Sequence, residues 1–468
     1  MKYNILIFKL LASFSLFSQT SQDSLFSLEK LYDAIRNNHP VAKQAALIPA
    51  AAKANMMRAR GAFDPFFYTY SDQKNYKGKN YYNLLESGFK LPTWWGIEGK
   101  VAYERSSGDF LNGENTLPPN GLVVAGVTVP LAQGLLIDQR RTILKQAEVF
   151  QQSAEWEQID MMNDLLYQAS VQYWGWVQAY NNAFILTNTY KNAYTRFLQV
   201  KEYLRLGDRA AIDTVEAYLQ VQTRQYELNE TLLQEKNARL LLSNFLWAEN
   251  NVPLELTEKW KPELPLQDEK YLPNIDSLQM LKNVTAQFHP NIQLYQFKIK
   301  QLDLERAWKQ EKLKPKVNLT YNILTQEVGK FPPIYANTFT QNFKWGLSIA
   351  FPILLRNERG DLAMTKIKMA DASYALTQKS REIENKMQAY YNETQNLYTQ
   401  SVLYKSINSN YLRLLQAEEI RFREGESSLF LINSRETKWI EAQSKLLEVR
   451  CKYYKSLAAL AYSAGSLR

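Results

Sequence analysis

The chain of 468 residues is long enough to bury a large core, and 22% charged with 46% apolar residues exclude both a disordered chain and a bundle of membrane-spanning helices. Its formal net charge is +9, but 56 basic residues are mixed with 47 acidic ones, which indicates a solvated surface rather than a nucleic-acid-binding protein. Two histidines and one cysteine, without any Ser/His/Asp set, phosphate loop or metal-ligand spacing, predict no enzyme activity, no cofactor and no metal site.

The N-terminal segment, MKYNILIFKLLASFSLFSQTSQD, has a lysine near its start, then an apolar stretch that Lys9 interrupts, and then small and polar residues. This arrangement is typical of a secretory signal peptide. We therefore predict that residues 1–18 are a signal that is cleaved near Ser18. An ordinary buried N-terminal helix is the alternative.

The two histidines, His39 and His289, each stand directly before a proline and lie 250 positions apart. Further matches pair Pro65 with Pro315, Pro130 with Pro352, and Gly207 with Gly425. The pattern indicates a tandem duplication, with a first repeat at 19–250, a proline-rich linker at 251–275 and a second repeat at 276–468. We expect each His-Pro pair to begin a helix, because proline is tolerated in the first helical turn.

Each repeat continues with a segment in which apolar residues alternate with small or polar ones. The apolar positions are Trp95, Ile97, Val101, Tyr103, Val123, Ala125, Val127 and Val129, and then Val317, Leu319, Tyr321, Ile323, Trp345, Leu347, Ile349 and Phe351. Between them stand Gly126, Thr128, Gly346, Ser348 and Ala350. This alternation predicts the wall of a water-filled β-barrel, whereas hairpins packed on a soluble core are the alternative. The first segment is long enough for an additional hairpin, so the number of strands stays open.

Two long helices, separated by a glycine turn, are predicted to follow in each repeat. In the first repeat a seven-residue spacing joins Met162, Ala169, Trp176, Ala183, Tyr190, Phe197 and Leu204, and then Leu219, Tyr226, Leu233, Leu240 and Trp247. In the second it joins Met369, Leu376, Ile383, Tyr390, Leu397, Tyr404 and Tyr411, and then Ile432, Trp439, Leu446, Tyr453 and Leu460. Sustained heptads predict helices wound around their neighbours. Residues 141–204 as one helix would span about 96 Å, which suits a device that crosses a compartment.

Several motifs together resemble the TolC-like outer-membrane efflux proteins, the outer membrane factors, over nearly the whole mature chain. They are the two HP openings, the junctions VTVPLAQG and IAFPILL, and the turns LRLGDRAAIDTVEAYL and RFREGESSLFLINSRE. The resemblance implies a mostly α fold with β. Tandem-duplicated coiled-coil hairpins would form a periplasmic tunnel, and β-hairpins would contribute to a trimeric β-barrel in the cell outer membrane.

The function that this resemblance implies is a passive exit duct of a tripartite efflux or type I secretion system. The implied partners are two further copies, a periplasmic adaptor (membrane fusion) protein, an inner-membrane pump of the RND or ABC type, and outer membrane lipid. The alternative is a periplasmic coiled-coil scaffold without a pore. Neither the exported substrate nor the particular adaptor and pump follows from the sequence.

The turns between the long helices are the candidate surface for docking the adaptor. Their residues are Arg205, Leu206, Gly207, Asp208, Arg423, Glu424, Gly425 and Glu426. Glycine reaches left-handed backbone conformations that other residues adopt at a cost. The two glycines therefore either make the turns only, or also leave the backbone bare for an adaptor to approach.

The resemblance also points to gate residues. Asp213, six positions after Gly207, matches an aspartate of the family's closed gate, but Phe422 stands where the family has its tyrosine partner. Phenylalanine has no hydroxyl for this link, so closure must depend on other contacts. Leu431 and Ser434 occupy the positions of two aspartates that form a cation-sensitive ring in better-known members, so we expect no such ring here.

Overall fold

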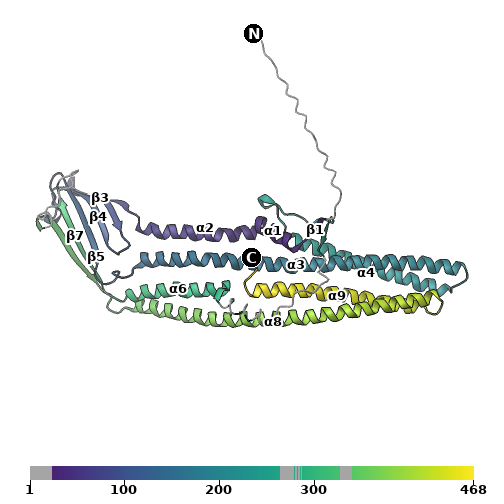
Figure 1. Cartoon of the computed structure of the whole chain (residues 1–468). Helices are drawn as coiled ribbons and strands as arrows, with labels where there is room; N and C mark the ends of the chain where they lie inside the picture. Colours follow the sequence, from purple (N-terminus) through teal and green to yellow (C-terminus); the bar gives the residue numbers. More distant parts are fainter. Residues whose placement is uncertain are drawn as a thin grey trace, which may run out of the picture. The chain divides into compact units, whose positions relative to one another are not determined.

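A computed structural model describes residues 24–263, 279, 282, 285, 287–326 and 340–467 (Figure 1). The predicted signal segment, 1–18, and the linker from residue 264 onward lie outside the described residues. The chain divides into two compact units, which we describe one at a time. The first comprises residues 1–39, 168–270 and 397–455, and the second 40–167, 271–396 and 456–468.

Most of the described residues are helical. The shorter helices are α1 (Leu28–Asn38), α2 (Pro40–Arg60) and α6 (Pro290–Glu311), and the longer ones α3 (Gln139–Arg205), α4 (Ala211–Ser243), α8 (Arg356–Arg423) and α9 (Leu429–Ser463). Helices α3 and α8 run unbroken for 67 and 68 residues, which confirms the prediction of one continuous helix over 141–204. None of the helices in the described part of the chain has a stretch apolar enough to cross a membrane.

Both His-Pro pairs begin a helix, as predicted. Pro40 is the first residue of α2, and Pro290 is the first residue of α6. The side chain of His289 caps α6, because its Nδ1 accepts a hydrogen bond from the backbone N–H of Asn291 at 3.1 Å. The histidines thus act where the chain enters a helix.

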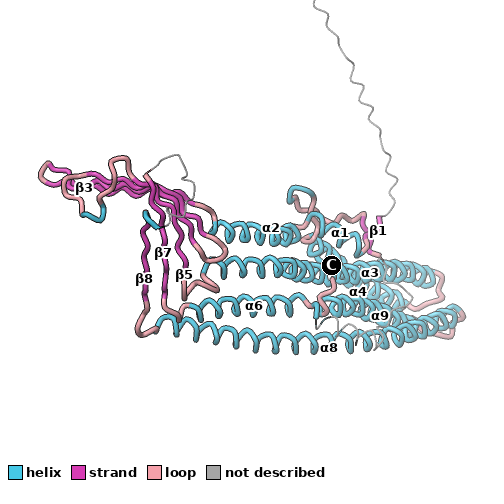
Figure 2. The backbone as a smooth tube through the Cα atoms, turned by 60° about the vertical axis from the view of Figure 1, so that its left-hand side comes forward, coloured by secondary structure: helices cyan, strands magenta, loops and turns pink. Residues whose placement is uncertain are grey.

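The second unit contains an antiparallel sheet of six strands in the order β2-β3-β4-β5-β7-β8 (Figure 2). The strands are β2 (Phe66–Tyr76), β3 (Lys79–Pro92), β4 (Glu98–Ser107), β5 (Leu122–Pro130), β7 (Lys316–Thr325) and β8 (Phe343–Ala350). The first β segment therefore does hold an additional hairpin, with four strands against two in the described part of the second. The two segments join where β5 pairs with β7.

The register of the sheet sorts its side chains onto two faces. Val101, Ala125 and Ile323 stand side by side in one row, while Tyr321 stands opposite Trp345. Because successive side chains point to opposite faces, the residues between them form the other face. That face has Asn322 between Gly126 and Lys344, Thr128 beside Thr320, and Asn318 beside Ser348. The predicted division into an apolar and a polar face is present over most of β5, β7 and β8, although the row of Ala102, Val124 and Leu324 on the polar face is apolar.

Three residues that the alternation assigned to strands lie outside them. Trp95 and Ile97 belong to the β3–β4 turn, which closes through the backbone N–H of Thr93 and the carbonyl of Ile97 at 3.0 Å. Phe351 follows the last residue of β8. An alternating pattern does not show where a turn interrupts the ladder, because a turn residue can also be apolar.

The core of the first unit is formed by heptad positions of α3 and α9. Trp176 is fully buried and lies 6.2 Å from the ring of Phe26, and Tyr173 donates a hydrogen bond to the carbonyl of Phe26 at 2.9 Å. Cys451 on α9 is also fully buried, and burial raises the pKa of its thiol to about 12. Among these residues Trp176 is a heptad position, and its burial agrees with the predicted heptad.

The heptad row of α4 has a different environment. Its members are exposed by about half or more of their area: Ile212 by 74%, Leu219 by 57%, Tyr226 by 63%, Leu233 by 59% and Leu240 by 46%. We call these five residues the α4 stripe. Trp247, which the heptad placed in this helix, lies beyond its end at Ser243 and forms a β-bridge with Pro253 instead.

Candidate docking turns and gate

The turn between α3 and α4 is closed by its own backbone. Gly207 has a φ of 85°, its N–H donates to the carbonyl of Leu204 at 3.0 Å, and the N–H of Asp208 donates to the carbonyl of Tyr203 at 2.9 Å. This pair of bonds around a left-handed glycine is the Schellman motif, which satisfies carbonyls at a helix C-terminus. The prediction of a left-handed glycine is confirmed here.

The turn between α8 and α9 repeats this arrangement. Gly425 has a φ of 79°, its N–H donates to the carbonyl of Phe422 at 3.1 Å, and the N–H of Glu426 donates to the carbonyl of Arg421 at 2.9 Å. A Cβ placed on Gly207 or Gly425 would meet no heavy atom within 4 Å. Substitution would therefore strain the backbone of either turn without a steric clash.

All eight candidate docking residues are exposed. They differ in their partners: Arg205 forms an ion pair with Glu202 at 2.6 Å and lowers the pKa of that carboxyl, while the Nε of Arg423 donates to the carbonyl of Glu419 at 3.4 Å. Leu206 is 58% exposed and Phe430, just beyond the second turn, 68%. The turns therefore present apolar side chains as well as charges, and Phe430 was not among the predicted docking residues.

The two turns contact each other through the gate candidate Phe422. Its ring packs against a buried cluster of Val200, Ala217 and Leu429, and the guanidinium of Arg209 lies 4.5 Å from the ring centroid. This distance permits a cation–π interaction. Phe422 has no hydroxyl, but its ring still joins the two turns.

The other gate candidate, Asp213, is placed differently. It lies in the first turn of α4, is partly buried, and forms no ion pair with any described residue. In the described part of the chain no hydrogen bond or ion pair joins its side chain to the residues that surround Phe422. The carboxylate that does reach across is Glu216, one turn later, which accepts a hydrogen bond from the Asn433 amide at 3.3 Å.

A buried ion pair, which sequence reasoning missed, joins α3 to α9 near the turns. The guanidinium of Arg196 donates to both carboxylate oxygens of Glu436, at 2.8 and 3.1 Å, and to Asn433 at 3.3 Å. The side chain of Glu436 is only 4% exposed. Such bidentate pairing is the strong form of an ion pair, and it connects helices that lie 240 residues apart in the chain.

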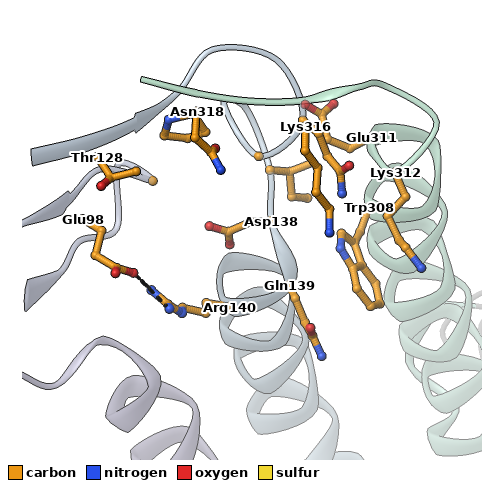
Figure 3. Close-up of a pocket in the computed structure, with 15 residues that line it drawn as sticks. Glu98, Thr128, Asp138, Gln139, Arg140, Trp308, Glu311, Lys312, Lys316 and Asn318 are labelled. Atoms are coloured by element: carbon orange, nitrogen blue, oxygen red, sulfur yellow. Dashed lines mark hydrogen bonds and ion pairs between the residues drawn. The ribbon is translucent and has the colours of Figure 1, made fainter. Parts of the chain in front are cut away.

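A pocket of about 690 Å³ lies in the second unit, where the polar face of the sheet meets α3 and α6 (Figure 3). Its side chains include Glu98, which pairs with Arg140 at 3.3 Å, and Trp308, which has the ammonium of Lys312 5.7 Å from its ring centroid. The charged lining residues are Glu98, Asp138, Glu311, Arg140, Lys312 and Lys316. Since three are acidic and three basic, the lining has no net charge to select one sign of solute.

A second polar cluster surrounds Asp160, also in the second unit. Burial, with the nearby charge of Asp164, raises the pKa of Asp160 to about 6, and its Oδ1 accepts a hydrogen bond from the Asn291 amide at 2.6 Å. Burial and the charge of Lys379 lower the pKa of His289 to about 4. The described residues contain no group of three or more His, Cys, Asp or Glu side chains placed to hold a metal ion.

Comparison with known proteins now identifies the fold. The chain is similar to the solved CmeC outer membrane channel of Campylobacter jejuni, with a TM-score of 0.65 and 14% identity over 94% of this chain and 86% of that one. It is similar to the MtrE outer membrane channel of Neisseria gonorrhoeae, with a TM-score of 0.63 and 14% identity over 94% and 89%. It is also similar to the outer membrane protein VceC of Vibrio cholerae, with a TM-score of 0.65 and 12% identity over 94% of this chain and 97% of that one. The chain therefore shares its fold with these solved outer-membrane channels.

The sequence comparison matches part of the second half of the chain. Residues 283–466 match the family model for outer membrane efflux proteins, and no curated protein matches the chain. This match and the shared fold agree with the predicted resemblance to the TolC-like outer membrane efflux proteins.

Proposed function

We propose that this chain is the exit duct of a tripartite efflux system, through which an inner-membrane pump drives solutes out of the cell. The observation that carries the proposal is the sheet, which has one apolar and one polar face and continues into paired long helices. Outer-membrane strands alternate in this way, with the apolar side chains toward lipid and the polar ones toward the lumen. The conduit itself is passive.

Three copies would complete the conduit. The α4 stripe supports an assembly, because five large apolar side chains in heptad spacing remain exposed on a single chain. Contiguous exposed apolar surface of this kind marks an interaction site. A neighbouring copy would cover the stripe, and the sheets of three copies would together form the wall in the membrane.

The docking partner we propose is a periplasmic adaptor protein, which would contact the two turns and recruit a pump of the RND or ABC type. The exposure of all eight docking candidates and the bare backbone at Gly207 and Gly425 support this role. Polar complementarity at such a small surface sets specificity more than affinity. Arg209 and Phe422, rather than Asp213 and a tyrosine, would then hold the turns together when the duct is closed.

The tandem duplication remains part of the proposal. Each half has a helix that begins at a His-Pro pair, then strands, a long helix, a glycine turn and a second long helix. We propose repeats at 19–250 and 276–468, joined by the linker at 251–275 and preceded by a cleaved signal at 1–18.

An export assay tests the proposal. The full chain is expressed, with the adaptor and pump encoded beside it, in a strain that lacks its own outer-membrane efflux channels, and accumulation of a fluorescent dye is measured. We expect less dye in cells that contain all three proteins than in cells whose pump is inactive. A scaffold without a pore would leave dye accumulation unchanged and would leave the outer membrane fraction without a detergent-extracted, heat-modifiable band.

A further inference from the structure

The loop end of the β2–β3 hairpin carries a compact group of aromatic and basic side chains that the proposed function does not use. Its members are Lys74, Tyr76, Lys77, Lys79, Tyr81 and Phe110, which we call the hairpin-tip cluster. In Figure 2 the far end of β3 reaches away from α2, the helix that leads into β2. The cluster therefore lies at the end of β2 and β3 opposite to α2.

The backbone builds this cluster in two ways. Lys77 and Gly78 both have positive φ, at 50° and 72°, which is the type I′ turn of a two-residue hairpin. The ladder shifts register between Lys74 and Asn75, which leaves Tyr81 as an extra, bulged residue. Asparagine or glycine is favoured at the position of Lys77, so a lysine there is a less favourable choice for the turn itself.

The loop after β4 brings the last ring into the cluster. The N–H groups of Asp109 and Phe110 donate to the carbonyls of Asn80 and Tyr81 at 3.1 and 2.9 Å. Gly108 permits this approach, since a Cβ there would lie 2.6 Å from the carbonyl of Tyr81. Phe110 then lies 4.7 Å from the ring of Tyr81, which in turn lies 5.9 Å from that of Tyr76.

The cluster is exposed, and its charges are not neutralised. Tyr76 is 54% and Phe110 52% exposed, and all three lysines lie at exposed positions. Two of the ammonium groups lie over rings, Lys74 at 5.1 Å from Tyr81 and Lys77 at 5.4 Å from Tyr76. In the described part of the chain none of the three lysines forms an ion pair, although Asp72 and Asp109 stand nearby in the sequence.

The lengths of the strands set the level of the cluster in a membrane. Strand β4 has 10 residues, which is enough to span the hydrocarbon core, whereas β3 has 14. The last β3–β4 pair is Asn83 with Ser107, and β3 begins four residues before it, at Lys79. At about 3.3 Å per residue the hairpin tip extends about 13 Å along the strand past that pair, and so beyond the hydrocarbon core to the level of the head groups.

We propose that the hairpin-tip cluster binds the phosphorylated sugar head groups of an anionic glycolipid in the outer leaflet. This inference rests on the proposed function, since it takes the sheet to span the outer membrane. Ammonium groups attract phosphate, and tyrosine rings favour the interface, where one side is apolar and the other is wet. The cluster offers both kinds of contact, and its unpaired lysines complement a negatively charged surface.

The test uses the full chain in dodecyl maltoside micelles, titrated with diphosphoryl lipid A and followed by mass spectrometry of the intact assembly. The variant carries Lys74→Gln, Lys77→Gln and Lys79→Gln together. At about fivefold per lysine, we expect lipid A binding to weaken by roughly a hundredfold. The control carries Lys366→Gln, Lys368→Gln and Lys386→Gln, which remove the same charge from exposed positions of α8 and should leave binding unchanged.

Two further titrations separate the sugar from the phosphate. Phe110→Ala should weaken the binding of lipid A, whether or not it has been dephosphorylated, but not that of phosphatidylglycerol. Equal binding of lipid A by the hairpin variant and the wild type would overturn the proposal. So would phosphatidylglycerol binding as tight as that of lipid A. Export measured in the strain of the dye accumulation assay is a separate readout. If the wild-type chain does not support export there, the result contradicts the proposed exit duct and not the lipid binding by the hairpin-tip cluster.

Discussion

Phe422 shows how one side chain can join two turns without a polar group. Its ring is held between an apolar cluster and the guanidinium of Arg209. We expect Arg209→Gln to remove a cation–π contact of about 0.5–1 kcal/mol and to loosen both turns locally. Hydrogen exchange should then become several-fold faster for amides at 203–210 and 420–428. Arg413→Gln, at an exposed position of α8, is the control, and equal exchange in both variants would contradict the prediction.

Asp160 gives the stability of the second unit a dependence on pH. Its folded pKa of about 6 exceeds the ordinary value near 3.9, so the ionised carboxylate is disfavoured in the fold. The resulting cost is present above about pH 6 and disappears as the pH falls toward 4. We expect Asp160→Asn, which keeps an oxygen for Asn291, to be more stable than the wild type at pH 7–8 but not at pH 4–5.

Thermal unfolding midpoints between pH 4 and 8 would check this. His289, with its pKa of about 4, changes stability in the opposite direction, but it does so in both proteins and cancels from the comparison. Asp371→Asn, at an exposed position of α8, is the control variant. A constant difference between Asp160→Asn and the wild type would show that the carboxyl is not perturbed.

Individual side chains were only partly predictable from the sequence. Gly207 and Gly425 were correctly predicted to be left-handed turn residues, because a glycine between two heptad helices usually ends the first of them. The Arg196–Glu436 pair was not, since each residue alone resembles any surface charge on a long helix. Its formation depends on which faces of α3 and α9 meet, and a single sequence does not contain that information.

At the scale of the elements, the two faces of β8 can be tested against each other. Leu347 stands in one row with Leu319 and Val129, whereas Ser348 stands beside Asn318 on the other face. If the apolar face meets lipid, Leu347→Arg should cost about 2–4 kcal/mol and deplete the assembled protein. Ser348→Arg should assemble normally, as measured by the amount of detergent-extracted protein. The reverse result would show that the faces are exchanged.

The glycine turns permit an experiment that separates two roles of glycine: its left-handed backbone conformation and its lack of a side chain. Asparagine tolerates the left-handed region, whereas alanine is strained there, and neither would clash at Gly207 or Gly425. If the adaptor needs a bare backbone, Asn and Ala should both abolish export at normal assembly levels. If the glycines serve only the turn, Asn should restore export and Ala should lower the unfolding temperature. Dye accumulation and thermal unfolding, measured on the same variants, distinguish these cases.

Whole elements were more predictable than single contacts, for a physical reason. The long helices and the alternation of β5, β7 and β8 repeat a period over many residues, so errors average out. The sequence predicted the β2–β3 hairpin only from the length of the first β segment. Its residues, such as Tyr70, Asp72 and Lys74, do not alternate clearly between apolar and polar. Its edge strand β2 is exposed along most of its length, so burial imposes little pattern on it.

At the scale of the whole molecule, the α4 stripe predicts an assembly. We expect the detergent-extracted protein to be a trimer by mass photometry, and Leu219→Glu with Tyr226→Glu to release monomers, because charges would then occupy an apolar interface. Gln225→Glu, at an exposed position of the same helix, should leave the trimer intact. A monodisperse monomer for the wild type would contradict the tunnel.

The burial of Cys451 has a practical consequence. It is the chain's only thiol, and with a pKa of about 12 it is almost entirely protonated near neutral pH, whereas the thiolate is the reactive form. We therefore expect the natural protein not to react with maleimides and other thiol labels. A cysteine introduced at Asp208 or Glu424 would be the single labelled position, so a spectroscopic probe at either turn would report its motion without removal of the native cysteine.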